Sequence, residues 1–419
     1  MEVGSPNKSH LTKDNALQIR RVVMNQGPLA GFRILDLSRV LSGPAATMLL
    51  ADQGADVIKV EPPEGDITRG MGTAEGNMTA FFLNINRGKR DICVNLKSPE
   101  GQEVVQRLAA TADVVVQNFR PGVVDELGLG YEQLRNINPQ IIYVSISGFG
   151  KNGPYATKRV YDPVIQALSG MTDIQADHEE RRPRMMRTVI PDKTTALTAA
   201  QAITAALLAR ERNGEGQHVE LNMLDATVAF MWPEGMMRLT VVGDEPDGEI
   251  GQVAQDLVYK TTDGFITVAA MSNDQWAGAC RAMEKLEWIS DPRFDTTAKR
   301  FENIKIRLQM TAEIINTQSN AFWLKKFDAE GVPCAPVLSR LEMLSHEQIL
   351  ANEIVQTYEH PVLGEVRQPR PAARMSNMAD KPTPIAPSLG EHNTEILEEL
   401  GYAASEIASL KTQGVIAEG

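Results

Sequence analysis

The feature that most constrains this fold is a strand-helix-strand pattern near the start of the chain. Residues 34–37 are predicted to form a short buried strand, and a predicted helix over 44–53 follows, with Pro44 at an early helical position. A β-branched run over 57–60 comes next. Because the connections are short, residues 33–61 are predicted to form two parallel strands joined by a helix.

The same alternation repeats further along the chain. A helix is predicted over 98–112, and continuous apolar strands are predicted over 114–116 and 141–146. Strands without a polar alternation are typical of parallel sheets that are covered on both faces. The sequence therefore predicts an α/β fold, a Rossmann-like open parallel sheet with helices on both sides.

After about residue 245 the pattern changes to that of a smaller α+β domain, predicted over 245–340. Its expected elements are an antiparallel hairpin of residues 257–260 and 265–268 and helices over 273–288 and 304–317. The remaining segment, 341–419, is rich in proline, which indicates an extended surface path before a last helix over 394–400.

A length of 419 residues suggests two domains. We expect residues 28–225 to form the N-terminal part of the large domain. Residues 1–27 are an extension without the continuous apolar core of a signal peptide.

Composition excludes several classes of partner. The net charge of -12 and a pI near 5.2 disfavour nucleic acid, whose phosphates require basic surfaces. No apolar run approaches the roughly 18 residues of a membrane span. Cys93, Cys280 and Cys334 show neither disulfide nor zinc spacing, which indicates a reducing compartment. We therefore predict a cytoplasmic protein that binds no metal, no nucleic acid and no membrane.

One glycine motif invites a different function. Residues 148–153 satisfy G-x-G-x-x-G after a predicted strand, which would suggest a nicotinamide oxidoreductase. In a dinucleotide site the last glycine opens a helix, whereas Pro154 follows here and residues 155–163 lack helical periodicity. A glycine-rich loop is the better interpretation, and the NAD-dependent oxidoreductase remains a remote alternative.

Single charged residues leave two interpretations open. Spacing alone makes four aspartates caps or strand-end groups rather than catalysts: Asp36, Asp162, Asp192 and Asp225. Asp192 is predicted at the N-cap of a long Ala-rich helix over 195–212. Six basic residues follow the first strands and fit either a phosphate site or a solvated face: Lys59, Arg69, Arg87, Lys89, Arg90 and Lys97.

Ordered sequence blocks resemble the family III CoA-transferases. This group includes formyl-CoA and carnitine CoA-transferases and the related α-methylacyl-CoA racemases. The matching blocks are residues 31–44, 48–61, Asn86-Arg87-Gly88-Lys89-Arg90, 96–101, Asn118-Phe119-Arg120-Pro121-Gly122, 161–162, 166–170, 214–217 and 389–392. They span nearly the whole chain after residue 28.

The resemblance implies an architecture and a set of partners. The fold would be a large Rossmann-like domain built from both chain ends, plus a smaller domain, and two ring-like subunits would interlock as a homodimer. The enzyme would act on acyl-CoA and small carboxylic acids, with coenzyme A as co-substrate. It would move CoA from a thioester to a free acid.

The resemblance also makes Asp192 the catalytic nucleophile. In the family this aspartate attacks the acyl-CoA carbonyl to give a mixed anhydride, and CoA then forms an aspartyl-CoA thioester. We expect a helix N-terminus to keep the carboxylate ionised.

Further residues are carried over as CoA contacts. The matching positions are Arg39, Val40, Leu41, Ser42, Lys97, Asn118, Phe119, Arg159, Tyr161 and Asp162. Two family arginines are replaced by Pro62 and Glu126, so Arg69, Arg87, Lys89 or Arg120 would have to hold the phosphates instead. No glycine-rich acceptor loop is found near 245–260, which argues against oxalate as the acceptor.

The main competing function is an α-methylacyl-CoA racemase, which needs two opposed acid/base groups. Racemases carry histidine at the position of Tyr161, and a phenol with a pKa near 10 is a poor base at neutral pH. A catalytically silent CoA-binding protein is a third reading. The sequence thus favours CoA transfer.

Overall fold

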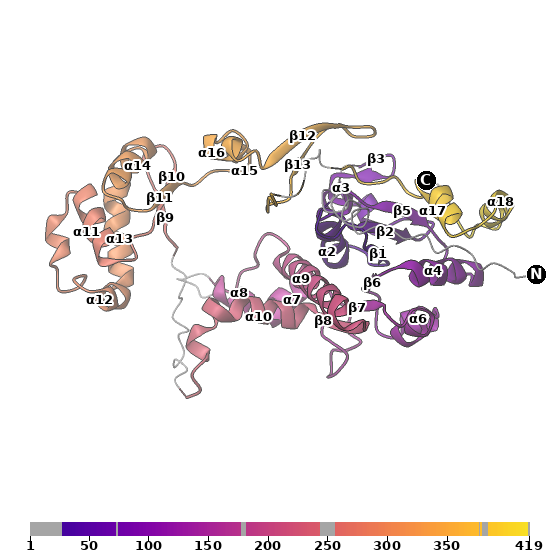
Figure 1. The fold of residues 1–419 in the computed structure, drawn as a ribbon. Coiled ribbons are helices and arrows are strands. Elements are labelled where there is room, and N and C mark those ends of the chain that lie inside the picture. The colour runs from indigo at the N-terminus through magenta and orange to yellow at the C-terminus, as the bar shows by residue number, and fades with distance from the viewer. Residues whose placement is uncertain are drawn as a thin grey trace, which may run out of the picture. The chain divides into compact units, whose positions relative to one another are not determined.

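The computed structural model describes residues 27–72, 74–176, 182–243, 256–376, 378 and 384–417. Two compact units divide the chain: unit 1 comprises residues up to Pro246 together with Ile354 onward, and unit 2 comprises Asp247–Glu353 (Figure 1). Apart from Gly27, the expected N-terminal extension lies outside the described residues. Unit 1 thus draws on both ends of the chain.

Unit 1 contains a six-stranded parallel sheet, which confirms the predicted fold class. The strand order is β5-β2-β1-β6-β7-β8. The strands are β1 (Arg33–Asp36), β2 (Asp56–Glu61), β5 (Arg90–Cys93), β6 (Val114–Gln117), β7 (Ile142–Ser147) and β8 (Gln217–Asn222). The chain builds outward from β1 to one edge and then from β6 to the other, so the topological switch point lies between β1 and β6. Ligands of open α/β sheets bind at such a point, beyond the carboxyl ends of the strands.

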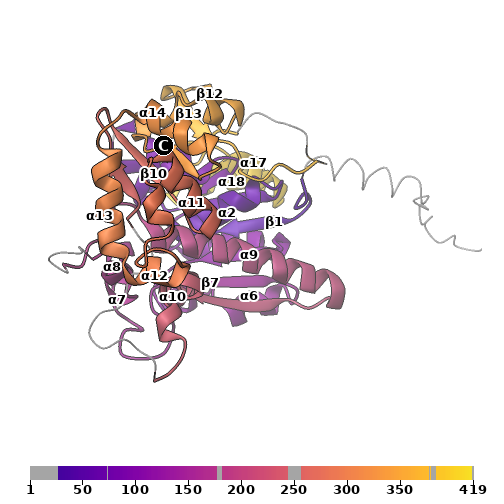
Figure 2. The same cartoon turned by 90° about the vertical axis from the view of Figure 1, so that its left-hand side faces the viewer.

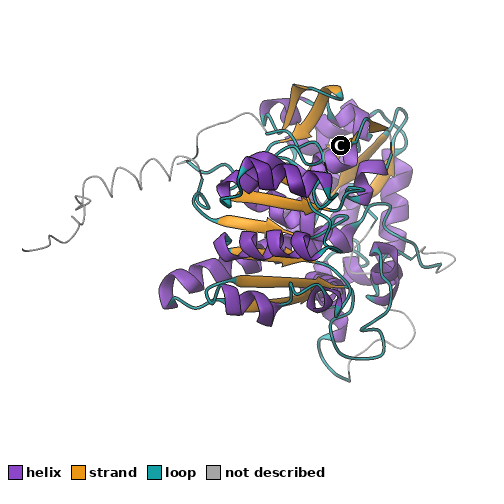
Figure 3. Ribbon diagram, turned by 90° about the vertical axis from the view of Figure 1, so that its right-hand side faces the viewer, coloured by secondary structure: helices purple, strands orange, loops and turns teal. Residues whose placement is uncertain are grey.

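Helices cover both faces of this sheet (Figures 2 and 3). Side chains alternate along β1, so Ile34 packs with helices on one face and Leu35 with helices on the other. The Ile34 face is covered by α2 (Ser42–Ala51) and α9 (Ile190–Asn213). The Leu35 face is covered by α4 (Pro99–Thr111), α6 (Tyr131–Ile137), α17 (Asn393–Glu399) and α18 (Ala404–Thr412).

The C-terminal helices are anchored by the motif Leu389-Gly390-Glu391-His392. Asp91 of β5 accepts a hydrogen bond from the Gly390 N–H through Oδ1 at 2.6 Å. The Asp91 N–H donates to His392 Nδ1 at 3.1 Å, and the His392 N–H donates to the Asp91 carbonyl at 3.0 Å. Gly390 has a φ of 68°, and a Cβ there would lie 2.4 Å from the Ala417 carbonyl oxygen. This motif therefore docks the tail on the sheet.

The remaining elements of unit 1 are short, except for the 13-residue helix α10. They are the 3₁₀ helices η1 (Ile67–Gly70) and η2 (Met237–Leu239), the strands β3 (Ala74–Glu75) and β4 (Met78–Thr79), and the helices α3 (Ala80–Asn86), α5 (Val123–Glu126), α7 (Asp162–Leu168), α8 (Met171–Ile174) and α10 (Met223–Gly235). A hairpin of β12 (Val355–His360) and β13 (Gly364–Pro369) lies in the segment that was expected to be extended. That segment is thus more regular than its prolines indicate.

Unit 2 contains a three-stranded antiparallel sheet in the order β11-β10-β9, and its predicted hairpin is confirmed. The strands are β9 (Val258–Lys260), β10 (Phe265–Val268) and β11 (Cys334–Pro336). The helices are α11 (Asn273–Ala282), η3 (Leu286–Ile289), α12 (Thr297–Glu302), α13 (Ile304–Ile315), α14 (Asn320–Ala329), α15 (Arg340–Met343) and α16 (Glu347–Ala351). The helix expected over 273–288 is interrupted where Glu284 takes a φ of 58°.

Candidate active site

The loops after β1 and β6 meet at the switch point of the sheet. Asn118 joins them: its Oδ1 accepts from the Arg39 N–H at 2.8 Å, and its Nδ2 donates to the Arg39 carbonyl at 2.8 Å. The Arg39 guanidinium lies 5.7 Å from the centre of the Phe119 ring. Three of the predicted site residues are therefore brought together, with a cation and an aromatic face at the edge where ligands bind.

Asp192 lies in the first turn of α9, and its predicted N-cap position is wrong. The helix begins at Ile190, with Val189 as the cap residue. Proline is tolerated in a first turn because the N–H that it lacks would have no helical partner there, so Pro191 is included in the helix. The Asp192 N–H donates to Asp162 Oδ2 at 3.1 Å. Asp162 therefore performs the capping that was predicted for Asp192.

The pKa of Asp192 is raised to about 6. Burial is the main cause, and the negative charge of Asp162 adds to it, while hydrogen bonding from the side chain and backbone of Ser42 lowers the pKa. The helix end therefore does not make this carboxylate more acidic than an ordinary aspartate. At neutral pH the ionised form still predominates, and it is more basic than an ordinary aspartate.

Asp162 is the second carboxylate of the site and is only 2% exposed. It lies at the start of α7, and its Oδ1 accepts from Gln166 Nε2 at 2.6 Å. Gln166 Oε1 in turn accepts from the Met186 N–H at 2.9 Å, which ties α7 to the segment that leads into α9. Both oxygens of Asp162 are thus engaged within the protein.

Val40, Leu41 and Ser42 form the turn between β1 and α2. Val40 has a φ of 70°, which is strained for a β-branched residue and is typical of functional sites. Leu41 and Ser42 are buried, and Ser42, the first residue of α2, acts to lower the pKa of Asp192. The turn therefore connects the switch point to the carboxylate.

Most of the basic residues that were considered for phosphate binding are buried and paired. Their shortest ion pairs are Lys59–Asp66 at 3.2 Å, Arg69–Glu61 at 2.7 Å, Arg87–Asp52 at 2.6 Å and Lys89–Asp36 at 2.9 Å. Arg90 pairs with Asp56 and Glu399, both at 2.7 Å. Both the phosphate and the solvated-face interpretations are wrong for the four buried cations, because their charges are already matched inside the protein.

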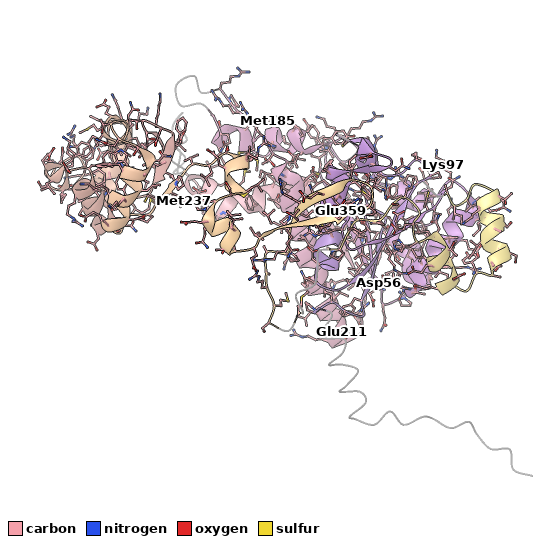
Figure 4. All side chains as sticks on the ribbon, turned by 90° about the horizontal axis from the view of Figure 1, so that it is seen from above. Asp56, Lys97, Met185, Glu211, Met237 and Glu359 are labelled. Atoms are coloured by element: carbon pink, nitrogen blue, oxygen red, sulfur yellow. The ribbon has the colours of Figure 1, made fainter. Side chains whose placement is uncertain are left out.

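The other predicted contacts are at the surface. Lys97 is exposed on unit 1 (Figure 4), and Arg120 and Arg159 are exposed as well. Tyr161 is 64% exposed and precedes α7. These residues are accessible to a ligand, whereas Asp162 beside them is not.

Three features that were weighed as sites have structural roles. Asp36 accepts from Thr47 Oγ1 at 2.7 Å and from Lys89 Nζ at 2.9 Å beneath the turn. Asp225 follows the cap residue Asn222, whose Oδ1 accepts from the Asp225 N–H at 2.8 Å. The 148–153 loop leads into turns rather than a helix, and the next helix starts at Asp162, which removes the basis for a dinucleotide site.

Neither a metal cluster nor a membrane-spanning helix is found among the described residues. No group of three or more His, Cys, Asp or Glu side chains that could hold a metal ion occurs among them. Within the same part of the chain, every helix is too short or too polar to cross a membrane.

Sequence comparison gives a match over most of the chain. Residues 29–393 match the family model described as CoA-transferase family III. The succinyl-CoA:glutarate CoA-transferase of Mus musculus is 38% identical over 398 residues, which cover 93% of this chain and 90% of that protein. The succinate–glutarate CoA-transferase of Agrobacterium fabrum is 35% identical, over 89% of this chain and 96% of its own. The formyl-CoA:oxalate CoA-transferase of Streptomyces avermitilis is 33% identical, over 93% and 99%.

Solved structures share the fold. Rv3272 from Mycobacterium tuberculosis has a TM-score of 0.78 and 30% identity, covering 88% of this chain and 99% of that one. A CAIB/BAIF family protein from Brucella suis has a TM-score of 0.77 and 32% identity, covering 90% and 100%.

Proposed function

Because the chain belongs to family III of the CoA-transferases and is an acyl-CoA:carboxylate CoA-transferase, we propose that Asp192 is its covalent nucleophile. The observation that carries this proposal is the environment of Asp192: half-buried, beside a second carboxylate, with a pKa raised to about 6. A desolvated carboxylate of this kind is ionised at neutral pH and more reactive than a solvated one.

The proposed reaction proceeds by four acyl transfers. A carboxylate oxygen of Asp192 attacks the thioester carbonyl, and the C–S bond breaks. CoA thiolate is released, and a mixed anhydride between Asp192 and the donor acyl group remains. The thiolate then attacks the Asp192 carbonyl and releases the donor acid, which leaves an aspartyl-CoA thioester. An acceptor carboxylate attacks this thioester, which releases CoA thiolate and forms a second anhydride. The thiolate then attacks the acceptor acyl carbonyl of this anhydride, and the new acyl-CoA is released. Asp192 is regenerated, and no net proton or water is consumed.

The neighbours of Asp192 have complementary roles in this scheme. Ser42 offers a hydroxyl and a backbone N–H, which orient the attacking carboxylate and can stabilise negative charge on an acyl oxygen. Asp162 fixes the start of α9 through the Asp192 N–H and raises the basicity of Asp192. The carboxylate of Asp162 is thus a positioning and electrostatic group, in place of the CoA contact expected from the sequence.

We assign CoA binding to the half-buried groups at the switch point and to exposed cations of unit 1. Arg39 and Phe119 offer a charge and an aromatic face at the carboxyl edge of the sheet. Lys97, Arg120 and Arg159 are exposed cations, as the phosphates of CoA require. Removing one of them is expected to raise the KM for acyl-CoA several-fold with a smaller change in kcat.

A dicarboxylic acid is the proposed acceptor, with succinyl-CoA as the proposed donor. The relatives named above act on succinyl-CoA with glutarate or on formyl-CoA with oxalate. Three exposed cations lie near Asp192 in the sequence of this chain: Arg182, Arg187 and Lys193. The second carboxylate of a dicarboxylic acid would pair with such cations. Comparing glutarate with pentanoate, which has the same carbon chain and one carboxylate, tests this point by mass spectrometry of the CoA products.

Homodimerisation is part of the proposal. Helices α7, α9 and α10 pack together in unit 1 (Figure 1), and they expose large apolar side chains. These residues are Leu168, Leu197, Leu208, Phe230 and Trp232. Exposed apolar groups of this number mark a protein–protein interface, and light scattering is expected to give twice the mass of one 46.0 kDa chain. A cytoplasmic location is also proposed, supported by three free thiols and testable by cell fractionation.

The activity test uses Asp192→Ala. This variant is expected to lose exchange between succinyl-CoA and free acid while it still binds CoA in calorimetry. Surviving exchange would disprove the nucleophile. A racemase would instead incorporate α-deuterium from heavy water into a (2R)-methylacyl-CoA without any acceptor acid, which we do not expect.

A further inference from the structure

The strained turn between β1 and α2 is held from below by one buried ion pair. Lys59 of β2 donates from Nζ to the Ser38 carbonyl at 3.0 Å and to Asp66 Oδ2 at 3.2 Å. The same Asp66 oxygen accepts from the Val40 N–H at 3.3 Å. The ion pair thus hydrogen-bonds the Ser38 carbonyl and the Val40 N–H, one on each side of Arg39. Val40 is the residue with a φ of 70°.

Asp66 is itself fixed by its own segment. Its Oδ1 accepts from the Thr68 N–H at 3.0 Å and from Thr68 Oγ1 at 2.9 Å. Its N–H donates to Glu61 Oε2 at 2.6 Å. The oxygen that reaches Val40 is therefore held by the end of β2 and by η1.

Two other side chains also hydrogen-bond the backbone of the turn. Asn118 bonds both the N–H and the carbonyl of Arg39, and Asp36 accepts from the Ser38 N–H at 3.0 Å. With residues 38–40 fixed in this way, α2 begins at Ser42 and packs along α9, whose first turn carries Asp192. A shift of the turn would therefore move the start of α2, and Ser42 with it, relative to the Asp192 carboxylate.

We propose that Lys59 and Asp66 are positioning residues for CoA transfer, which hold the Val40 turn so that Ser42 stays against Asp192. This inference rests on the proposed role of Asp192, and it assigns a reaction-related role to a buried ion pair that touches no substrate. Burying two charges is costly in free energy. Here the two side chains hydrogen-bond the strained backbone of the turn as well as each other, so the buried pair holds that backbone in place.

A second buried pair offers a matched control. Arg87 donates to both oxygens of Asp52, at 2.9 and 2.6 Å. Asp52 lies at the C-terminal end of α2, whereas the Lys59–Asp66 pair lies under its start. Asp52→Asn and Asp66→Asn therefore make the same chemical change in two pairs that differ in their relation to the turn.

The experiment compares these variants as full-length enzyme. Asp66→Asn is expected to slow CoA exchange roughly 10- to 100-fold, the cost of a small misplacement in an active site. It should also raise the apparent pKa of Asp192 in the pH–rate profile by roughly half to one pH unit, because a displaced Ser42 lowers that pKa less. Asp162 of α7 still faces Asp192 in both variants. Asp52→Asn should lower the melting temperature but leave both the rate and the apparent pKa unchanged.

Two further variants make the result decisive. Val40→Gly, which adopts positive φ without strain, should restore part of the rate in the Asp66→Asn background. Thr68→Val removes only one hydrogen bond to Asp66, so it provides a milder test if Asp66→Asn does not fold. A wild-type rate and pH profile in both Asp66→Asn and Thr68→Val would overturn the inference. Persistent exchange in Asp192→Ala would instead overturn the function on which it rests.

Discussion

Beneath the turn that follows β1, buried cations and carboxylates face each other in pairs, whereas at the start of α9 two carboxylates share one site. Lys89 lies 2.9 Å from Asp36, and burial alone would raise the pKa of Asp36, but Lys89, Lys59 and Ser38 outweigh it and lower the pKa to about 2. At Asp192, burial and Asp162 raise the pKa to about 6. Matched charges give a carboxylate that is inert, and a like charge gives one that is reactive.

The largest effect on stability is expected from removing the cation of a buried ion pair beneath the turn that follows β1. Lys89→Met leaves the Asp36 carboxylate buried without its closest opposite charge. Breaking one partner of a buried pair costs about 3–5 kcal/mol of unfolding free energy. Urea unfolding followed by circular dichroism measures this loss, and a change below 1 kcal/mol would mean that this buried ion pair does not stabilise the fold.

The next effect concerns the carboxylate pair. Asp162→Asn removes the negative charge beside Asp192 but keeps an oxygen that can accept the Asp192 N–H. The pKa of Asp192 should fall from about 6 toward its ordinary value, so the acid limb of the kcat/KM profile should move to lower pH. The plateau rate should fall roughly tenfold, because a less basic carboxylate is a weaker nucleophile. An acid limb at the wild-type pH would show that the two carboxylates do not interact.

A smaller effect is expected at Asp91, a buried carboxylate of β5 that lies beside the carboxylate of Glu61. Burial, followed by the charge and hydrogen bond of Glu61, raises the pKa of Asp91 well above its usual range. A raised folded-state pKa gives stability that is complete at low pH and is lost as the pH rises through it. Asp91→Asn removes this loss, so its melting temperature should gain on the wild type as the pH rises from about 4 to 8. Equal pH dependence of the two proteins would contradict the raised pKa of Asp91.

The smallest effect is expected at the surface. Arg107 and Glu103 form an exposed ion pair at 2.7 Å on α4. Water and salt screen such a pair, so Arg107→Ala should change the unfolding free energy by well under 1 kcal/mol. The same urea experiment checks this, and a loss like that of Lys89→Met would remove the contrast between buried and exposed pairs.

The sequence predicted β1, β2, β6 and β7 because these strands are largely buried, and runs such as Val114–Gln117 are continuous and β-branched. Strands β5 and β8 were not predicted, and β8 is half-buried or exposed along its length. The hairpin of β12 and β13 was missed because few of its residues are apolar and it lies within a proline-rich segment. Without a run or an alternation of apolar residues, the local sequence does not separate an exposed hairpin from an extended tail.

The candidate site was only partly predictable. Resemblance identified Asp192 and the loop residues Arg39 and Asn118, but burial and partners cannot be read from one chain. Lys59 and Lys89 were therefore indistinguishable from surface cations, although both are buried and paired. The contact between Ser42 and Asp192 joins segments 150 residues apart and had no separate signal in the sequence.

The central claim, that Asp192 carries the acyl group and CoA during transfer, is tested most directly by trapping. Enzyme incubated with succinyl-CoA is treated with hydroxylamine, digested and examined by mass spectrometry, with Asp192→Asn as the control. We expect the hydroxamate on the peptide that contains Asp192, and none in the control. An unmodified Asp192 peptide in an enzyme that is exchanging CoA, or a hydroxamate on another carboxylate, would contradict the account.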